Sequence, residues 1–194
     1  MKKLMLLSAV LVFFQVDGFC DTQSYTVLRR LSSMTFEVSA QLHMVHGESR
    51  AFSGTITGDP ADITTAKIAV KLDPASLNTD NEKRDADLRD KCLETAKFPA
   101  IEFESTTIST DAKALKEGQP VNATVNGKLK MHGLEKDVSV PVKILLKGDV
   151  LTAEGSMAVV LDEWNIFRPK VMVVQLQNDV KIAFTIGGRR VPSQ

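Results

Sequence analysis

Apolar and polar residues alternate over most of the chain, and this two-residue period constrains the fold more than any other feature. Successive side chains of a β-strand point to opposite faces, so an alternating stripe marks a strand with one buried face. Such stripes occupy residues 36–42, 68–72, 101–103, 125–131, 138–146, 151–161 and 180–186. They predict an all-β chain of about eight strands.

The links between the stripes are short. Residues 132–136 connect two long stripes, and Lys147-Gly148-Asp149 is a tighter link that is typical of a hairpin turn. Such links predict antiparallel neighbours, because parallel strands need a crossover of a dozen or more residues. Within the stripes, Pro141 is expected at a sheet edge or a bulge, and Gly155 at a bend or a bulge.

An open sheet of this size exposes its edge strands, and closure into a barrel removes those edges. The stripes therefore predict an eight-stranded antiparallel barrel. The interior of such a barrel is just wide enough for packed side chains or for one slender ligand. The stripes alone leave two alternatives open, a barrel with a filled core and a barrel that holds a ligand.

One charged segment, between the stripes at 68–72 and 101–103, breaks the alternation. Leu88 and Cys92 are four residues apart, which places them on one face of a helix. Either Asn81 or Asp80 is suited to cap the start of that helix. We therefore expect one inserted helix over about residues 82–96, with Leu88 and Cys92 packed against the barrel and Cys92 as a small core residue.

The first twenty residues have the pattern of a secretory signal peptide. Lys2 and Lys3 form a positive start, and residues 4–14 form an almost unbroken apolar run. This run is too short for a membrane span, which needs about 20 apolar residues. Cleavage after either Gly18 or Cys20 fits the preference for small residues. The prediction is a Sec-type signal peptide over residues 1–20 and a product in the periplasm or the medium.

A lipid anchor on Cys20 is not expected. Acylation of a bacterial lipoprotein needs a small residue just before the cysteine and an aliphatic residue three positions before it. Phe19 and Asp17 occupy those places. We therefore expect a mature chain without a lipid anchor.

The charge balance excludes one class of partner. The chain has 24 Lys and Arg residues and 24 Asp and Glu residues, so its formal net charge is zero. Nucleic-acid binding normally needs a basic face, so no nucleic-acid partner is expected. After the first twenty residues no stretch is apolar enough and long enough to be an integral membrane segment.

No motif of the sequence argues for catalysis. The chain has no Gly-rich phosphate loop, no G-x-S-x-G and no H-E-x-x-H. His43 and His46 are three residues apart, so they face opposite sides of a strand. Only a bend of the strand before Gly47 would let them share a metal ion. His132 is expected to be a solvated turn residue. We expect neither an enzyme nor a metal site nor a cofactor.

Five short motifs occur in order along the chain. They are Ser33-Met34-Thr35-Phe36, then 43–47 with Phe52-Ser53-Gly54, then 76–79 with Asn81 and 84–89, then 98–103, and finally 127–133 with 138–142. In this order and at this spacing the chain resembles the YceI-like family of exported lipid-binding proteins, from about Ser24 to Gly187. Residues 92–94 and 164–169 depart from the commoner form of the family.

The resemblance implies a lipocalin-like barrel over residues 21–190 with one inserted helix. It also implies a non-catalytic protein that holds an isoprenoid or another long-chain amphiphile in its interior, as a carrier or scavenger. The alternative is a secreted structural or stress-protective barrel with a filled core. The sequence leaves open whether the chain forms a homodimer.

The implied binding site has an apolar part and a polar rim. The positions of the apolar part follow from the stripes, and the tunnel itself from the resemblance alone. The rim would consist of Arg84 and Arg89 on the inserted helix, although both arginines also fit a solvated helix face with weak ion pairs. The tunnel would be lined by Phe36, Val38, Val70, Phe103, Val125, Met131, Val140, Met157 and Phe184.

Overall fold

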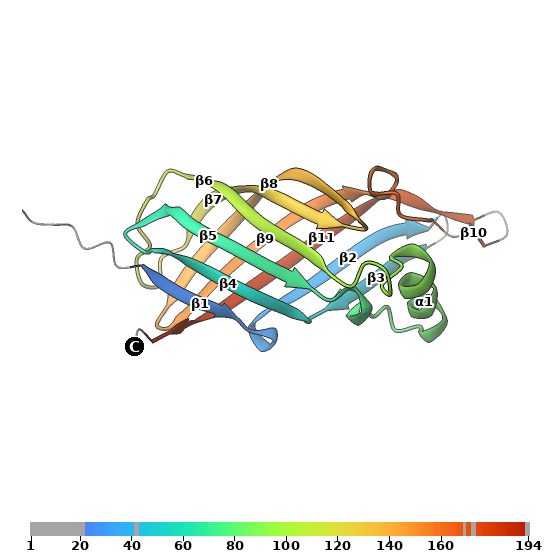
Figure 1. The fold of residues 1–194 in the computed structure, drawn as a ribbon, viewed down its shortest axis with the longest axis horizontal. Helices are drawn as coiled ribbons and strands as arrows, with labels where there is room; N and C mark the ends of the chain where they lie inside the picture. The colour runs from blue at the N-terminus through green and yellow to red at the C-terminus, as the bar shows by residue number, and fades with distance from the viewer. Residues whose placement is uncertain (1–21, 41–42, 169, 172–173, 193–194) are drawn as a thin grey trace, which may run out of the picture.

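The computed structural model describes residues 22–40, 43–168, 170–171 and 174–192. They form an elongated, closed antiparallel β-barrel, with helix α1 (Glu82–Asp87) at one end and the C-terminus at the other (Figure 1). The predicted signal peptide over residues 1–20 and the apolar Leu42 lie outside the described residues.

The strands account for most of the chain, as the alternation predicted. Three short 3-10 helices lie between strands, at Arg29–Leu31 (η1), Pro74–Ser76 (η2) and Leu161–Trp164 (η4). The strands are β1 (Gln23–Val27), β2 (Ser33–Ala40), β3 (His43–Ser49), β4 (Phe52–Asp59), β5 (Asp62–Leu72), β6 (Ile101–Thr110), β7 (Val121–Met131), β8 (Leu134–Lys147), β9 (Val150–Val160), β10 (Lys170–Val171) and β11 (Val174–Val191).

The barrel closes because β1 pairs with both β4 and β11. Around the ring the order is β1, β4, β5, β6, β7, β8, β9 and β11. Towards the helix end, β2 and β3 continue β1 and β4, with η1 at the first break and Arg50-Ala51 at the second. The prediction of an eight-stranded antiparallel barrel is confirmed.

Two-residue turns join β7 to β8 and β8 to β9. His132 and Gly133 have φ of +51° and +77°, the conformation that a tight hairpin prefers. The predicted link over residues 132–136 is therefore too long, because residues 134–136 already pair with β7. The second turn is Gly148-Asp149, with Gly148 at φ +58°, and here the predicted hairpin is confirmed.

The inserted helix is shorter than predicted. The Asn81 side chain accepts a hydrogen bond from the Arg84 backbone N–H at 3.0 Å and caps the first turn. The winding widens to a π-helix over Leu88–Cys92 (η3), because the Leu93 N–H donates to the Leu88 carbonyl. Glu94 then takes φ +44°, which ends the helix before the predicted residue 96.

Gly155 lies neither at a bend nor at a bulge, because the pairing of β9 with β11 runs through it without a shift. Its role is close packing. A Cβ atom at this position would lie 2.7 Å from Cζ of Phe184 and 2.9 Å from the carbonyl oxygen of Pro141. The same residue is the last of β9 that pairs with β8, opposite Val142.

Candidate functional site

The barrel encloses a cavity of about 190 Å³. Its wall is made of the inward-facing side chains of β2, β4, β5, β6, β7, β8, β9 and β11, and every one of them is apolar. The lining residues are Met34, Phe52, Ile56, Ile68, Val70, Leu72, Ile101, Phe103, Val125, Leu129, Met131, Val138, Val140, Val142, Ile144, Ala153, Met157, Val159, Ile182, Phe184 and Ile186.

The structure brings seven of the nine predicted tunnel residues together in this wall. They come from six different strands, so only closure of the barrel places them around one space. These residues are Val70, Phe103, Val125, Met131, Val140, Met157 and Phe184.

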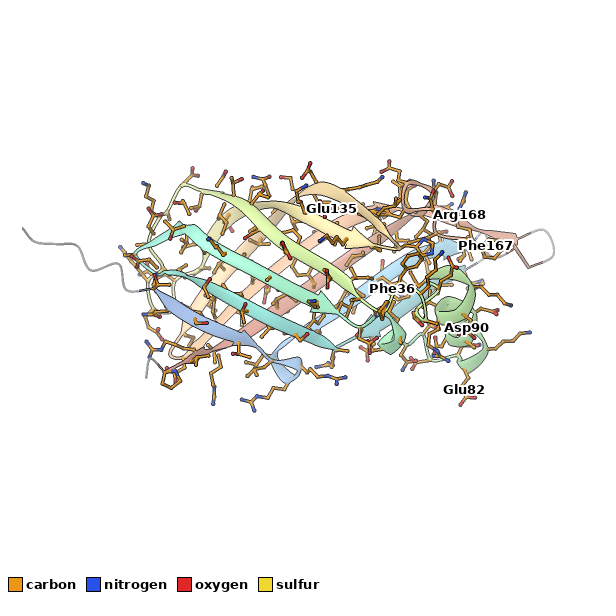
Figure 2. The ribbon with its side chains drawn as sticks, viewed as in Figure 1. Phe36, Glu82, Asp90, Glu135, Phe167 and Arg168 are labelled. Atoms are coloured by element: carbon orange, nitrogen blue, oxygen red, sulfur yellow. The ribbon has the colours of Figure 1, made fainter. Side chains whose placement is uncertain are left out.

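Phe36 and Val38 are buried in the barrel but do not line the cavity. The segment between β5 and β6 folds into this end of the barrel, so inward-facing side chains here contact protein. Phe36 lies next to that segment (Figure 2), and its ring occupies the space beside Gly47, close to the methyl group of Thr79. Val38 pairs with Val45 and Val180 at the same end. The placement of both residues in the tunnel wall is therefore corrected.

Three lining residues, Met34, Phe52 and Ile56, lie outside the alternating stripes identified from the sequence. Phe52 and Ile56 belong to β4, whose inner face reads Phe52, Gly54, Ile56 and Gly58. Glycines at alternate positions hide the apolar stripe. The alternation of glycine with polar residues was the signal that could have revealed this strand.

The side chains that line the cavity offer no polar group, so the wall is suited to contact with hydrocarbon. For scale, an engineered apolar cavity of about 150 Å³ stays dry and binds one benzene. The space in this barrel therefore takes a short hydrocarbon segment without rearrangement. A longer chain needs side chains to rotate, and Met34, Met131 and Met157 are suited to this because methionine is unbranched and flexible.

Apolar side chains plug the barrel at the helix end. The buried residues there include Cys92 and Leu93 from the inserted segment and Trp164 and Ile166 from the segment after β9. Lys136 lies at the edge of this plug, with its Nζ 5.2 Å from the centroid of the Trp164 ring and 3.0 Å from Oε2 of Glu163.

His132 holds the plug in place. Its side chain is only 7% exposed, its Nδ1 lies 3.0 Å from the carbonyl oxygen of Trp164, and its Nε2 lies 2.9 Å from Oε2 of Glu94. Both partners accept hydrogen bonds, so the ring satisfies both when both its nitrogens carry hydrogen. The ring also packs on Phe98 at 4.6 Å between centroids. The expectation of a solvated residue is wrong, because residues 94–98 and the segment after β9, both distant in sequence, enclose this side chain.

Arg84 and Asp85 fix the start of the inserted helix through Thr79. The guanidinium of Arg84 donates to Oγ1 of Thr79 at 2.7 Å and to its carbonyl oxygen at 2.6 Å. The hydroxyl and the N–H of Thr79 both donate to the buried carboxylate of Asp85. Asp85 is therefore no solvated helix residue. Contact of Arg84 and half-buried Arg89 with a ligand headgroup stays a prediction.

The remaining titratable candidates form no second site. His43 and His46 are exposed on β3, and Nδ1 of His46 lies 3.3 Å from Oε1 of Glu37. Among the described residues there is no cluster of three metal-ligating side chains, and no helix is long and apolar enough to span a membrane. Burial raises the pKa of the Cys92 thiol to about 11, and the nearby Asp87 carboxylate adds to the effect.

Comparison with known proteins identifies relatives of the chain. Protein YceI of Salmonella arizonae is 32% identical over 106 residues, which are 54% of this chain and 51% of that protein. Protein YceI of Salmonella newport matches to the same extent. The chain thus matches about half the length of these curated relatives.

Solved structures with low sequence identity share the fold. A polyisoprenoid binding domain from Saccharophagus degradans, implicated in plant cell wall breakdown, superposes with a TM-score of 0.71 at 15% identity, covering 86% of this chain and 98% of that one. BcnA of Burkholderia cenocepacia superposes with a TM-score of 0.70 at 21% identity, covering 83% and 98%. A family model described as the YceI-like domain matches residues 25–187, which is most of the chain. The protein is therefore a member of the YceI-like family.

Proposed function

We propose that the protein binds one isoprenoid-type lipid inside the barrel and acts as a non-catalytic carrier or scavenger outside the cytoplasm. The observation that carries the proposal is the cavity, whose wall is apolar throughout. The polyisoprenoid binding domain of Saccharophagus degradans has the same fold and supports an isoprenoid as the ligand class. The signal-like residues 1–20 support export.

Burial of hydrocarbon supplies enough free energy for such binding without a strong polar contact. Ten buried methylenes contribute about 8 kcal/mol at about 0.8 kcal/mol each. Association and ordering of the chain cost several kcal/mol. A prenyl chain longer than ten carbons therefore reaches roughly micromolar affinity. Rotation of the lining methionines makes room for the part of the chain that exceeds the cavity.

The alternative is a structural or stress-protective barrel with a filled core. A filled core leaves no continuous space between its side chains, since protein interiors are packed to about 0.75 of their volume. The cavity of about 190 Å³ favours the lipid-binding function over this alternative.

A bulky substitution in the wall tests the proposal. Val140→Trp places an indole ring in the cavity, so binding of tritiated geranylgeraniol should fall at least tenfold. The free energy of unfolding in urea should change by less than the 1–3 kcal/mol that is typical when a packed core is overfilled. Equilibrium gel filtration measures the binding.

Lys143→Trp is the matched control, because Lys143 is exposed on the same strand. It should bind geranylgeraniol like the wild type. A wild-type protein that binds no geranylgeraniol, together with a destabilised Val140→Trp variant, would instead favour the filled barrel. The intact mass of the exported protein tests the expected cleavage after Gly18 or Cys20 without a lipid anchor, and acyl chains on Cys20 would contradict it.

A further inference from the structure

Strands β8 and β9 are paired over only part of their length. Their ladder runs from Lys147 opposite Val150 to Val142 opposite Gly155. Beyond that point, within the described residues, Leu134–Pro141 of β8 pairs only with β7, and Ser156–Val160 of β9 pairs only with β11. The barrel wall therefore has an interruption on the helix side of Val142, which we call the β8/β9 slot.

Pro141 explains where the ladder ends. Continued register would place Pro141 opposite Ser156, and the Pro141 carbonyl points towards β9, close to Gly155. Proline has no backbone N–H, so it cannot donate the next hydrogen bond of the ladder. Pro141 was expected at a sheet edge, and its side of β8 that faces β9 is such an edge, because no described strand pairs with it there.

The slot opens onto the cavity. Val138 and Val140 on β8 and Met157 and Val159 on β9 flank it, and all four line the cavity. Val138 and Met157 are half-buried, although both face inward. At about 3.4 Å per residue, residues 137–141 give the slot a length of about 17 Å. At the helix end, the ion pair between Lys136 and Glu163 bounds it.

A second interruption, between β5 and β6, is bridged. These strands pair from Ala69 opposite Glu104 to Leu72 opposite Ile101. Beyond this ladder, the Ser105 hydroxyl accepts a hydrogen bond from the Ile68 N–H at 2.8 Å. The N–H groups of Ile63 and Leu115 donate to the carbonyls of Lys113 and Pro60, which ties the neighbouring loop across β5. No cavity-lining residue comes from this stretch of β6.

We infer that the β8/β9 slot is the route by which the lipid passes sideways between solvent and cavity; this inference rests on the proposed function. Passage through the helix end would displace the buried Trp164 and break the contact of His132 with the Trp164 carbonyl. Passage through the slot breaks no backbone hydrogen bond of the barrel, because the ladder is absent there. Movement of the flexible Met157 side chain widens the slot.

A chemical staple tests the route. Ser139 and Ala158 are exposed and would face each other across the slot in the continued register. The variant Ser139→Cys with Ala158→Cys, in a background with Cys20→Ala and Cys92→Ala, is joined with a short bis-maleimide. Uptake of tritiated geranylgeraniol from phosphatidylcholine vesicles is then followed in time. The staple should slow uptake at least tenfold and change the equilibrium amount bound less than threefold.

Two further staples in the same background serve as controls. Lys143→Cys with Glu154→Cys joins β8 and β9 where the ladder is closed, and Lys67→Cys with Thr106→Cys spans the bridged interruption. Both should take up geranylgeraniol at the unstapled rate. Unchanged uptake with the slot stapled, or slowing by the β5/β6 staple alone, would overturn the inference. A background protein that binds no geranylgeraniol at equilibrium would contradict the proposed function and, with it, the inferred route.

Discussion

His132 contacts two segments that are far from it in the sequence, residues 94–98 and the segment after β9. Its ring contacts Glu94 after the inserted helix, Phe98 before β6 and the carbonyl of Trp164 after β9. Each lost hydrogen bond costs about 1 kcal/mol, and alanine at a positive φ adds strain. We therefore expect His132→Ala to lower the free energy of unfolding by about 2–4 kcal/mol, measured in urea.

His46→Ala is the matched control for this prediction. The His46 side chain is exposed and its contact with Glu37 is a surface pair, so the variant should stay within about 0.5 kcal/mol of the wild type. His132→Asn should be intermediate, because asparagine tolerates the positive φ but lacks the ring. If His132→Ala unfolds with the same free energy as the wild type, the contacts of His132 do not hold the plug in place.

Cys92 should be chemically inert in the folded protein. Burial raises the pKa of its thiol to about 11, so folding disfavours the thiolate. At pH 8 only about one thiol in a thousand is ionised, and the thiolate is the reactive species. In a Cys20→Ala variant, iodoacetamide should label Cys92 at pH 8 only when urea unfolds the chain. Rapid labelling under native conditions would contradict the buried position.

At the scale of elements, the inserted helix is attached to the barrel by only part of one face. Cys92 is buried in the core, whereas Leu88 is half-buried against it. Leu88→Ala should therefore cost about 1–2 kcal/mol, below the 2–5 kcal/mol of a fully buried leucine. Urea unfolding measures this difference.

Lys91→Ala provides the comparison on the exposed face of the same helix. It removes one surface ion pair with Asp87, which is worth about 0.3–0.5 kcal/mol. Equal effects of Leu88→Ala and Lys91→Ala would mean that Leu88 makes no packing contribution.

Alternating stripes correctly predicted β7, β8, β9 and β11, because each of these long strands has one face in the core. The ends of elements were less predictable. The helix ends early because of a π-turn and the positive φ of Glu94, and neither has a clear local signal. The β8/β9 slot had one sequence signal, Pro141, but alternation describes the faces of a strand and not which neighbour it pairs with.

The candidate site likewise has residues that the sequence predicts and residues that it does not. Residues such as Val125 and Val140 follow from periodicity, since every inward position of a closed barrel borders the interior. Phe36 and Val38 satisfy the same pattern but lie at the helix end, where the Phe36 ring is close to Thr79 of the inserted segment. The position of that segment depends on tertiary packing. The role of His132 depends on partners 32 and 38 residues away, so no local pattern could reveal it.

At the scale of the whole molecule, the barrel combines three features. Its cavity is apolar throughout, one end is plugged by buried side chains, and one side has an interrupted wall. Under the proposed function, this arrangement would keep a hydrocarbon chain away from water and leave a lateral path for its exchange. The proposed function therefore predicts that the interior holds an isoprenoid-type lipid.

Mass spectrometry of an organic-solvent extract shows whether the interior holds such a lipid. The wild-type protein and the Val140→Trp variant are purified from the same cells without detergent and extracted with chloroform and methanol. We predict an isoprenoid-type lipid in the wild-type extract, near one molecule per protein, and at least tenfold less in the variant extract. A wild-type extract without such a lipid, or equal amounts from both proteins, would contradict lipid binding in the interior.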